Sequence, residues 1–322
     1  MDLIFLGTSA GTPTRARNVS ATALLAAQGK HWCLVDCGEG TQQQVLRSPL
    51  SLSDLDAIFI THVHGDHCFG LPGLLGSAGM AGRTRPLRLV GPAALGPWLR
   101  LTLEMSHSWL PFALEFEAVE GLSACAVGEW QVSTAELSHR VPSWAYVFTE
   151  RHPEPRLNLE RLAEEGIPRG PLWGELAHGR EVLWQGRALR AADYWQAGRA
   201  AQRVVICGDN DRPELLAQAC LSAQVLVHEA TYTQAVLTAG KQAYGHSSAL
   251  QVARFAAEAG LPNLVLTHFS PRFQAQPGRG PAIDEIAAEA ASVYSGQLHL
   301  AQDLAHYHLG RDGRLLRRAP QA

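Results

Sequence analysis

The chain has 322 residues, of which 46% are apolar and 18% charged, a composition typical of a globular protein with a core large enough for one domain or two. No run of 18 uncharged apolar residues is present, which argues against a membrane-spanning protein, and we expect the apolar N-terminal segment to form a strand rather than a signal peptide. The net charge of −3 argues against a uniformly basic nucleic-acid-binding protein, although a local basic patch is compatible with it.

Short apolar runs predict strands, and they alternate with segments whose pattern favours helices. We expect strands at residues 3–6, 21–26, 31–35, 57–60, 87–90, 145–148, 204–207, 225–228 and 264–267. We expect helices at residues 40–47, 92–105, 213–219, 247–259 and 283–294. Because several strands end in potential metal ligands, the fold class that we predict is α/β, a sandwich with its site along one rim of a sheet.

Residues 150–200 differ from the sequence on either side, because prolines and glycines interrupt every regular pattern there. We predict an insertion that leaves the main domain, with a helix near residues 157–165; a disordered surface loop is the alternative. The six cysteines are scattered without a Cys-x-x-Cys pair, which favours reduced thiols and a cytoplasmic protein.

The densest group of chemically active side chains follows the apolar run 57–60. His62, His64, Asp66 and His67 place three imidazoles and a carboxylate at the end of one predicted strand. These donors suit Zn²⁺ and related divalent metals, and ligands on a loop at a strand end can converge on one point. A polar loop with accidental histidines is the alternative, and the density of histidine argues against it.

Three later residues complete two metal shells when they are added to the first four. His139, Asp209 and His268 each follow or flank an apolar strand. We predict that His62, His64 and His139 bind one metal. Asp66, His67 and His268 then bind the second metal, and Asp209 bridges the two.

The pattern His62-x-His64-x-Asp66-His67 resembles the HxHxDH motif that defines the metallo-β-lactamase superfamily. Within that superfamily the chain resembles the ribonuclease Z (tRNase Z) family. The similar segments are residues 5–13 (FLGTSAGTP), 17–18 (RN), 36–42 (DCGEGTQ), 64–74 (HGDHCFGLPGL), 138–143 (SHRVPS), 228–232 (HEATY) and 245–248 (GHSS).

The resemblance implies one αββα four-layer metallo-β-lactamase domain spanning residues 1–322, with residues 150–200 as a protruding arm. It implies a zinc-dependent endoribonuclease with two Zn²⁺ per subunit that removes the 3′ trailer from precursor tRNA and leaves a 3′-hydroxyl. The arm would then be an exosite for tRNA, often supplied by the other subunit of a homodimer. Arginines at 151, 156, 161, 169 and 180 are candidates for phosphate contacts, although nearby glutamates dilute their charge.

The family also implies roles for individual residues. Asp66 would accept a proton from the attacking water, and His246, oriented by Glu229, would protonate the leaving oxygen. A helix cap or turn is the alternative for His246, and a salt bridge at the rim for Glu229. At residues 208–213 (GDNDRP) the chain has one residue more than the family pattern, so Asp211 competes with Asp209 for the bridging position.

Hydroxyls and one arginine near the ligands are candidates for substrate binding. Thr8 and Ser9 follow the first strand, Ser247 precedes a predicted helix, and Arg272 follows the ligand His268. Helix capping is an equally good interpretation of Ser247. For Arg272, a position on the surface without a functional contact is equally plausible.

A small-molecule phosphodiesterase of the same superfamily is the alternative function, and such an enzyme would not need the arm. A non-catalytic RNA-binding protein and a β-lactamase fit the sequence less well.

Overall fold

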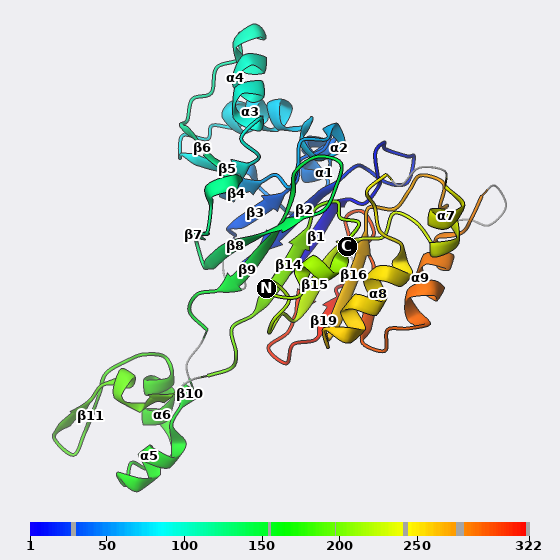
Figure 1. Cartoon of the computed structure of the whole chain (residues 1–322). Coiled ribbons are helices and arrows are strands. Elements are labelled where there is room, and N and C mark those ends of the chain that lie inside the picture. Colours follow the sequence, from blue (N-terminus) through cyan, green and yellow to red (C-terminus); the bar gives the residue numbers. More distant parts are fainter. Residues whose placement is uncertain (27–29, 154–155, 197, 241–243, 275–279, 320–322) are drawn as a thin grey trace. The chain divides into compact units, whose positions relative to one another are not determined.

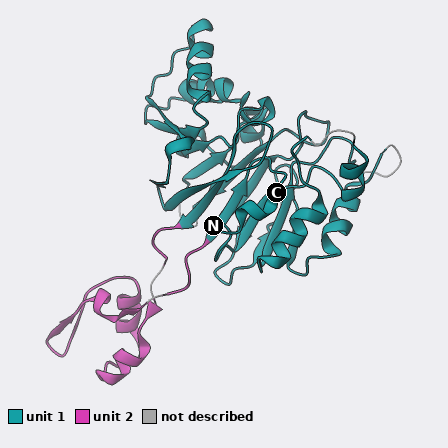
Figure 2. Ribbon diagram, in the orientation of Figure 1, with its two compact units in different colours: residues 1–149, 203–322 teal, residues 150–202 magenta. Residues whose placement is uncertain are grey.

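The computed structural model describes residues 1–26, 30–153, 156–196, 198–240, 244–274 and 280–319. The chain forms two compact units, residues 1–149 with 203–322 and residues 150–202 (Figure 2). Among the described residues the longest helix has 11 residues, and no helix is long and apolar enough to traverse a lipid bilayer.

The larger unit contains two sheets. The first has eight strands in the order β19-β18-β1-β2-β3-β4-β5-β6, and the second has seven in the order β17-β16-β15-β14-β9-β8-β7 (Figure 1). The first sheet comprises β1 (Asp2–Gly7), β2 (Ala21–Leu25), β3 (Trp32–Val35), β4 (Leu55–Phe59), β5 (Leu87–Gly91), β6 (Leu114–Ala118), β18 (His306–Leu309) and β19 (Leu315–Arg317). The second comprises β7 (Ala124–Val127), β8 (Trp130–Leu137), β9 (Ser143–Glu150), β14 (Arg203–Cys207), β15 (Val225–Glu229), β16 (Asn263–Thr267) and β17 (Gln297–Leu300).

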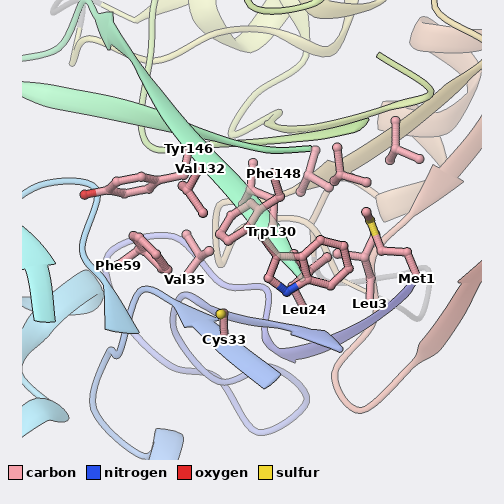
Figure 3. Packing of buried hydrophobic residues seen from close by; sticks show 14 of the residues in the cluster. Met1, Leu3, Leu24, Cys33, Val35, Phe59, Trp130, Val132, Tyr146 and Phe148 are labelled. Carbon is pink, nitrogen blue, oxygen red and sulfur yellow. The ribbon is translucent and has the colours of Figure 1, made fainter. Parts of the chain in front are cut away.

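The two sheets face each other across a layer of buried apolar side chains. Successive residues of a strand point to opposite faces, so Leu3 and Phe5 enter this central layer while Ile4 and Leu6 point outward. Phe59 of the first sheet meets Phe148 of the second in an edge-to-face contact with ring centroids 5.3 Å apart (Figure 3). The central layer of the sandwich therefore forms because side chains point alternately to the two faces along the strands of both sheets.

Helices cover the outer faces of both sheets. The first sheet carries α1 (Thr41–Leu46), α3 (Leu71–Met80) and α4 (Leu95–Met105), whose buried residues join the apolar cluster on its outer side. The second carries α8 (Ala249–Glu258) and α9 (Ile283–Ala291), which join the cluster on the opposite outer side. Shorter elements complete this unit: α2 (Gly65–Cys68), α7 (Gln234–Ala239) and the 3-10 helices Leu52–Asp54, Val119–Gly121 and Pro213–Leu216. The resulting order of layers, helix–sheet–sheet–helix, confirms the predicted αββα fold class.

Local sequence explains where α8 begins. Ser248 precedes the helix and accepts a hydrogen bond from the backbone N–H of Gln251, whose side chain accepts one from the backbone N–H of Ser248. This reciprocal pair satisfies two backbone donors that the first turn of a helix leaves unpaired. Because Ser248 fixes the start of α8, the preceding residues 245–247 are held against the rim where the functional side chains lie.

The smaller unit contains its own elements and its own apolar core. It is built from α5 (Leu159–Glu164), α6 (Pro171–Ala177), the 3-10 helix Ala191–Tyr194 and two short antiparallel pairs, β10 (Arg156–Leu157) with β13 (Trp195–Gln196) and β11 (Val182–Trp184) with β12 (Arg187–Leu189). Leu162 and Leu176 are fully buried in its core, and Tyr194 is 1% exposed. The backbone N–H of Glu150 bonds to the carbonyl of Gln202, so the two ends of this unit lie next to each other.

Candidate metal centre

The candidate ligands lie on loops that follow strands of both sheets. His62 and His64 follow β4, Asp209 follows β14, and His268 follows β16. His139 lies two residues beyond β8, while Asp66 and His67 are in α2. His268 has a φ of 55°, a left-handed conformation that costs a non-glycine residue free energy and is typical of functional positions.

The first group of donor atoms belongs to His62, His64, His139 and Asp209, all within 4.8 Å of one another. His64 Nδ1 lies 3.0 Å from His62 Nε2 and 3.1 Å from His139 Nε2. Asp209 Oδ2 lies 3.6 Å from the Nε2 atoms of both His62 and His139. Four donors thus converge as a tetrahedral metal ion would require.

The second group belongs to Asp66, His67 and His268. The Nε2 atoms of His67 and His268 lie 3.2 Å apart, and His268 Nε2 lies 3.3 Å from Asp66 Oδ2. Asp209 Oδ1 lies 3.5 Å from His67 Nε2 and 3.4 Å from His268 Nε2. Asp209 therefore turns one carboxylate oxygen toward each group, as a bridging ligand does.

Asp211, the competitor for the bridging position, is in none of these donor groups among the described residues. Its backbone N–H donates to the carbonyl of Ser138 at 2.9 Å. Asn210, between the two aspartates, donates its backbone N–H to Glu229, and its side-chain nitrogen lies 3.0 Å from His228 Nε2.

The histidines are oriented through the ring nitrogen that faces away from the centre. His67 Nδ1 lies 2.7 Å from Asp36 Oδ2, and His139 Nδ1 lies 2.7 Å from the carbonyl oxygen of Gly245. The remaining pairs, each 3.0 Å, are His62 Nδ1 with Thr61 Oγ1 and His268 Nδ1 with Thr231 Oγ1. An acceptor on one nitrogen fixes the tautomer and turns the lone pair of the other toward a metal. The arrangement fits a bound cation, because such lone pairs facing one another at about 3 Å repel in its absence.

Electrostatics support the same interpretation. Burial lowers the pKa of His62 and of His64, which keeps these imidazoles neutral and able to bind a metal. Burial also lowers the pKa of His67, but the charges of Asp209, Asp66 and Asp36 outweigh it and raise that pKa to about 10. The surrounding carboxylates therefore favour positive charge here, whether a proton or a metal cation carries it.

Glu229 and His246 form a pair beside the donor groups. Glu229 is 1% exposed, and its Oε1 accepts the backbone N–H of Asn210 at 3.0 Å and lies 3.0 Å from His246 Nδ1. Burial lowers the pKa of His246, but the charges of Glu229 and Asp209 outweigh it and raise that pKa to about 9. Since Glu229 occupies Nδ1, Nε2 is the atom left to exchange a proton with a substrate.

An open cavity of about 640 Å³ gives access to the centre. Its lining includes His64, Asp66, His139, Asp209, His246 and His268 among the predicted residues, together with Arg272. Arg272 is exposed, and its guanidinium lies 5.2 Å from the ring centroid of Tyr232. An arginine at this position offers a planar cation to a phosphate that enters the cavity.

Thr8, Ser9 and Ser247 do not reach this cavity, so a direct contact with substrate does not fit their placement. All three are fully buried. The Thr8 hydroxyl donates to Asp303, that of Ser9 to the carbonyl of Thr12, and that of Ser247 to the carbonyl of Asn210. Each hydroxyl thus holds a loop in place, and the cavity wall near the first strand is made by Ala10 and Gly11 instead.

Sequence reasoning missed the residues that orient the ligands. Asp36 directly follows β3; its carboxylate lies 2.7 Å from His67 Nδ1 and accepts the backbone N–H of Thr61 at 2.8 Å. Thr231 donates its hydroxyl to the carbonyl of His268 and also contacts Glu229. Their only sequence signal is a polar residue at or just beyond a strand end, which does not distinguish an orienting residue from a ligand.

This architecture is also found in proteins of known structure. A solved metallo-β-lactamase fold protein, YhfI of Bacillus subtilis, superposes with a TM-score of 0.65 at 19% identity, covering 95% of this chain and 98% of that one. A family model described as the anti-Pycsar protein Apyc1 matches residues 1–103, which contain the His62–His67 motif. The fold and the donor groups together define a protein of the metallo-β-lactamase fold with a candidate metal site.

Relatives in sequence identify the family to which the chain belongs. The ribonuclease Z of Pseudomonas putida strain W619 is 64% identical over 318 residues, which cover 97% of this chain and 98% of that protein. The structure of the short form of human tRNase Z has a TM-score of 0.65 at 26% identity and covers 96% of this chain and 100% of that one. The chain belongs to the ribonuclease Z family and is a metal-dependent endoribonuclease, which confirms the family predicted from its motifs.

Proposed function

We propose that the enzyme binds two Zn²⁺ ions and cleaves precursor tRNA at its 3′ end, leaving a 3′-hydroxyl on the tRNA and a 5′-phosphate on the trailer. The observation that supports this most strongly is the carboxylate of Asp209, which presents one oxygen to each of two donor groups. Five imidazoles and two carboxylates are donors that suit zinc. The tRNA substrate follows from the ribonuclease Z relatives and from the name of human tRNase Z.

The chain's own residues divide the chemistry between them. A pair of bound divalent cations lowers the pKa of water and stabilises negative charge on phosphate oxygens. Asp66 Oδ2 accepts the backbone N–H of Gly11 at 2.6 Å, which fixes the carboxylate at the cavity wall. Burial raises the pKa of Asp66, but the positive charge at His67 outweighs it and lowers that pKa, so the carboxylate is ionised. We assign Asp66 the role of accepting the proton of the attacking water.

His246 completes the reaction on the other side of phosphorus. When the P–O3′ bond breaks, the ribose 3′-oxygen must gain a proton, and His246 Nε2 donates it. Glu229 holds the ring and favours its protonated form, since a buried carboxylate stabilises an adjacent imidazolium. Arg272, exposed at the cavity wall, binds a neighbouring phosphate.

We assign residues 150–202 the role of an exosite that binds the folded part of tRNA. Its eight arginines are balanced by eight acidic residues, so net charge does not attract RNA to it. Arg161, Arg180, Arg187 and Arg199 are each paired with a glutamate. The phosphate contacts therefore fall to Arg156, Arg169 and Arg190, which are exposed and have no acidic partner within 4 Å among the described residues.

We propose a homodimer that uses the outer surface of α3 and α4. Met80, Leu101, Met105 and Trp109 are 92%, 56%, 75% and 81% exposed. Four large apolar side chains on one pair of helices and the loop after them are unusual on a monomer and typical of an interface.

All six cysteines are free, and we place the enzyme in the cytoplasm, where thiols stay reduced.

The test is a cleavage assay with defined products. The zinc-loaded protein should cut a precursor tRNA at the boundary between tRNA and trailer, and the two fragments should carry a 3′-hydroxyl and a 5′-phosphate. Metal analysis should give about two zinc ions per chain. Hydrolysis of a small phosphodiester without cleavage of precursor tRNA would instead support the phosphodiesterase alternative.

A further inference from the structure

An exposed phenylalanine lies at the entrance to the metal centre and has no role in the chemistry above. Phe69 follows α2 directly, is 59% exposed and lines the same cavity as His64, Asp66 and His246. A large apolar ring that remains open to solvent beside an active site is a candidate contact for substrate, because its exposure is unfavourable unless a ligand covers it.

The position of the Phe69 ring is fixed by its neighbours. It stacks on the indole of Trp98 in α4, with ring centroids 6.0 Å apart and planes inclined by 27°. On another side it lies against Gly65, where an added Cβ would come within 2.4 Å of the ring. Trp98 is half-buried and thus anchors the pair. Trp98 on one side and Gly65 on another thus restrict where the Phe69 ring can lie.

The positions of His246 and Phe69 indicate which nucleotide meets this surface. His246 protonates the 3′-oxygen that stays with the tRNA, so the last tRNA nucleotide lies on the side of His246. That side is formed by loops of the second sheet, including Tyr232, whose ring centroid is 6.0 Å from that of His246. Phe69 directly follows α2 and stacks on Trp98 of α4, two elements that belong to the first sheet's side of the unit. We assign this side of the cavity to the trailer.

We propose that the Phe69–Trp98 pair stacks with the base of the first trailer nucleotide and so positions the scissile phosphate over the metal centre. The inference rests on the proposed function, since it requires a single-stranded trailer. Stacking on an aromatic ring tolerates every base, which suits an enzyme whose substrates carry trailers of different sequence. No hydrogen-bonding readout of the base is needed.

The experiment compares natural precursor tRNA with a precursor that lacks the base at the first trailer position. Phe69→Ala should lower kcat/KM on the natural substrate by about 5- to 150-fold, the usual contribution of one stacked base. On the abasic substrate, wild type and Phe69→Ala should cleave at similar rates. Phe69→Trp should restore cleavage of the natural substrate, whereas Phe69→Leu should not, because leucine is apolar but cannot stack.

Further measurements distinguish base stacking from a general loss of apolar surface, of metal or of the dimer. Leu221→Ala, which removes a side chain of similar exposure (58%) outside the cavity, should leave kcat/KM unchanged. Inhibition by mature tRNA, which has no trailer, should be equal in wild type and Phe69→Ala. An equal loss on the natural and abasic substrates, a loss of zinc, or a change from dimer to monomer in Phe69→Ala would overturn the stacking role. If the wild type failed to cleave precursor tRNA at all, the proposed function itself would be wrong.

Discussion

Asp209 and Asp211 lie two residues apart, yet only Asp209 turns its carboxylate toward the histidines. We predict that Asp209→Ala lowers the zinc content from about two ions per chain to about one or fewer, because both donor groups lose an oxygen. Asp211→Ala should retain the zinc of the wild type and serves as the matched control. Normal zinc in the first variant and loss in the second, measured by mass spectrometry of the metal, would reverse the assignment.

His246 is placed for either of two roles, a general acid or a metal ligand. Its Nδ1 lies 3.0 Å from Glu229 Oε1, as an acid held by a carboxylate requires, but also 3.7 Å from Asp209 Oδ2, in a donor group with His268. We predict that His246→Ala keeps its zinc and slows single-turnover cleavage by about 10²- to 10⁴-fold, the usual contribution of acid catalysis. A variant that loses zinc in parallel with activity would make His246 a ligand.

Which site residues can be predicted from sequence depends on how local their signal is. His62, His64, Asp66 and His67 are dense enough to be recognised together, because four donors fall within six residues. The placement of Thr8 could not be predicted, because its hydroxyl donates a hydrogen bond to Asp303, which lies 295 positions later in the sequence. In the sequence, a loop whose hydroxyls point into the protein cannot be distinguished from a loop whose hydroxyls face a substrate, because contacts with distant residues decide between the two.

At the scale of elements, buried strands were easier to predict than edge strands. All nine predicted strands are present, because central strands such as β15 (Val225–Glu229) are fully buried and begin with an uninterrupted apolar run. The edge strand β6 (Leu114–Ala118) was missed, since Glu115 and Glu117 are exposed and break the run. The predicted helix at 213–219 is a 3-10 helix at Pro213–Leu216, in a loop shaped by tertiary contacts.

We call the smaller unit, residues 150–202, the arm, and its exposed arginines give a prediction about tRNA binding. Replacing Arg156, Arg169 and Arg190 with alanine should weaken tRNA binding and flatten its dependence on salt, with the slope of log K against log salt falling by about 0.7–0.9 per lost phosphate contact. Binding is measured by filter retention at several salt concentrations.

The matched control removes charges without changing their balance. Arg180 and Glu175 pair with each other, their nitrogen and oxygen 2.6 Å apart, so the double variant Arg180→Ala with Glu175→Ala keeps the net charge of the arm. It should bind tRNA nearly as the wild type does. Equal salt slopes for the triple variant and the wild type would show that these arginines do not contact phosphates.

For the whole molecule, the arm and the metal centre are separable parts of the chain. Every predicted ligand, Glu229 and His246 belong to the larger unit, and the smaller unit has its own buried core. Deleting residues 153–198 and joining 152 to 199 by a short glycine–serine linker keeps the bond between Glu150 and Gln202 and the pair of Glu150 with Arg199. Removing residues 157–186 alone would instead delete β11 and leave its partner strand β12 unpaired.

This separation allows a test of whether the arm acts on its own active site or on that of the partner subunit. A chain without the arm lacks the tRNA contacts, and an Asp66→Ala chain lacks the base and a ligand, so each alone should cleave precursor tRNA poorly. If the arm serves the partner's site in a symmetric dimer, mixing and re-associating equal amounts should restore about a quarter of the wild-type rate, because half of the dimers are mixed and each has one complete site. No recovery in mixed dimers shown to form by native mass spectrometry would mean that the arm serves the active site of its own chain.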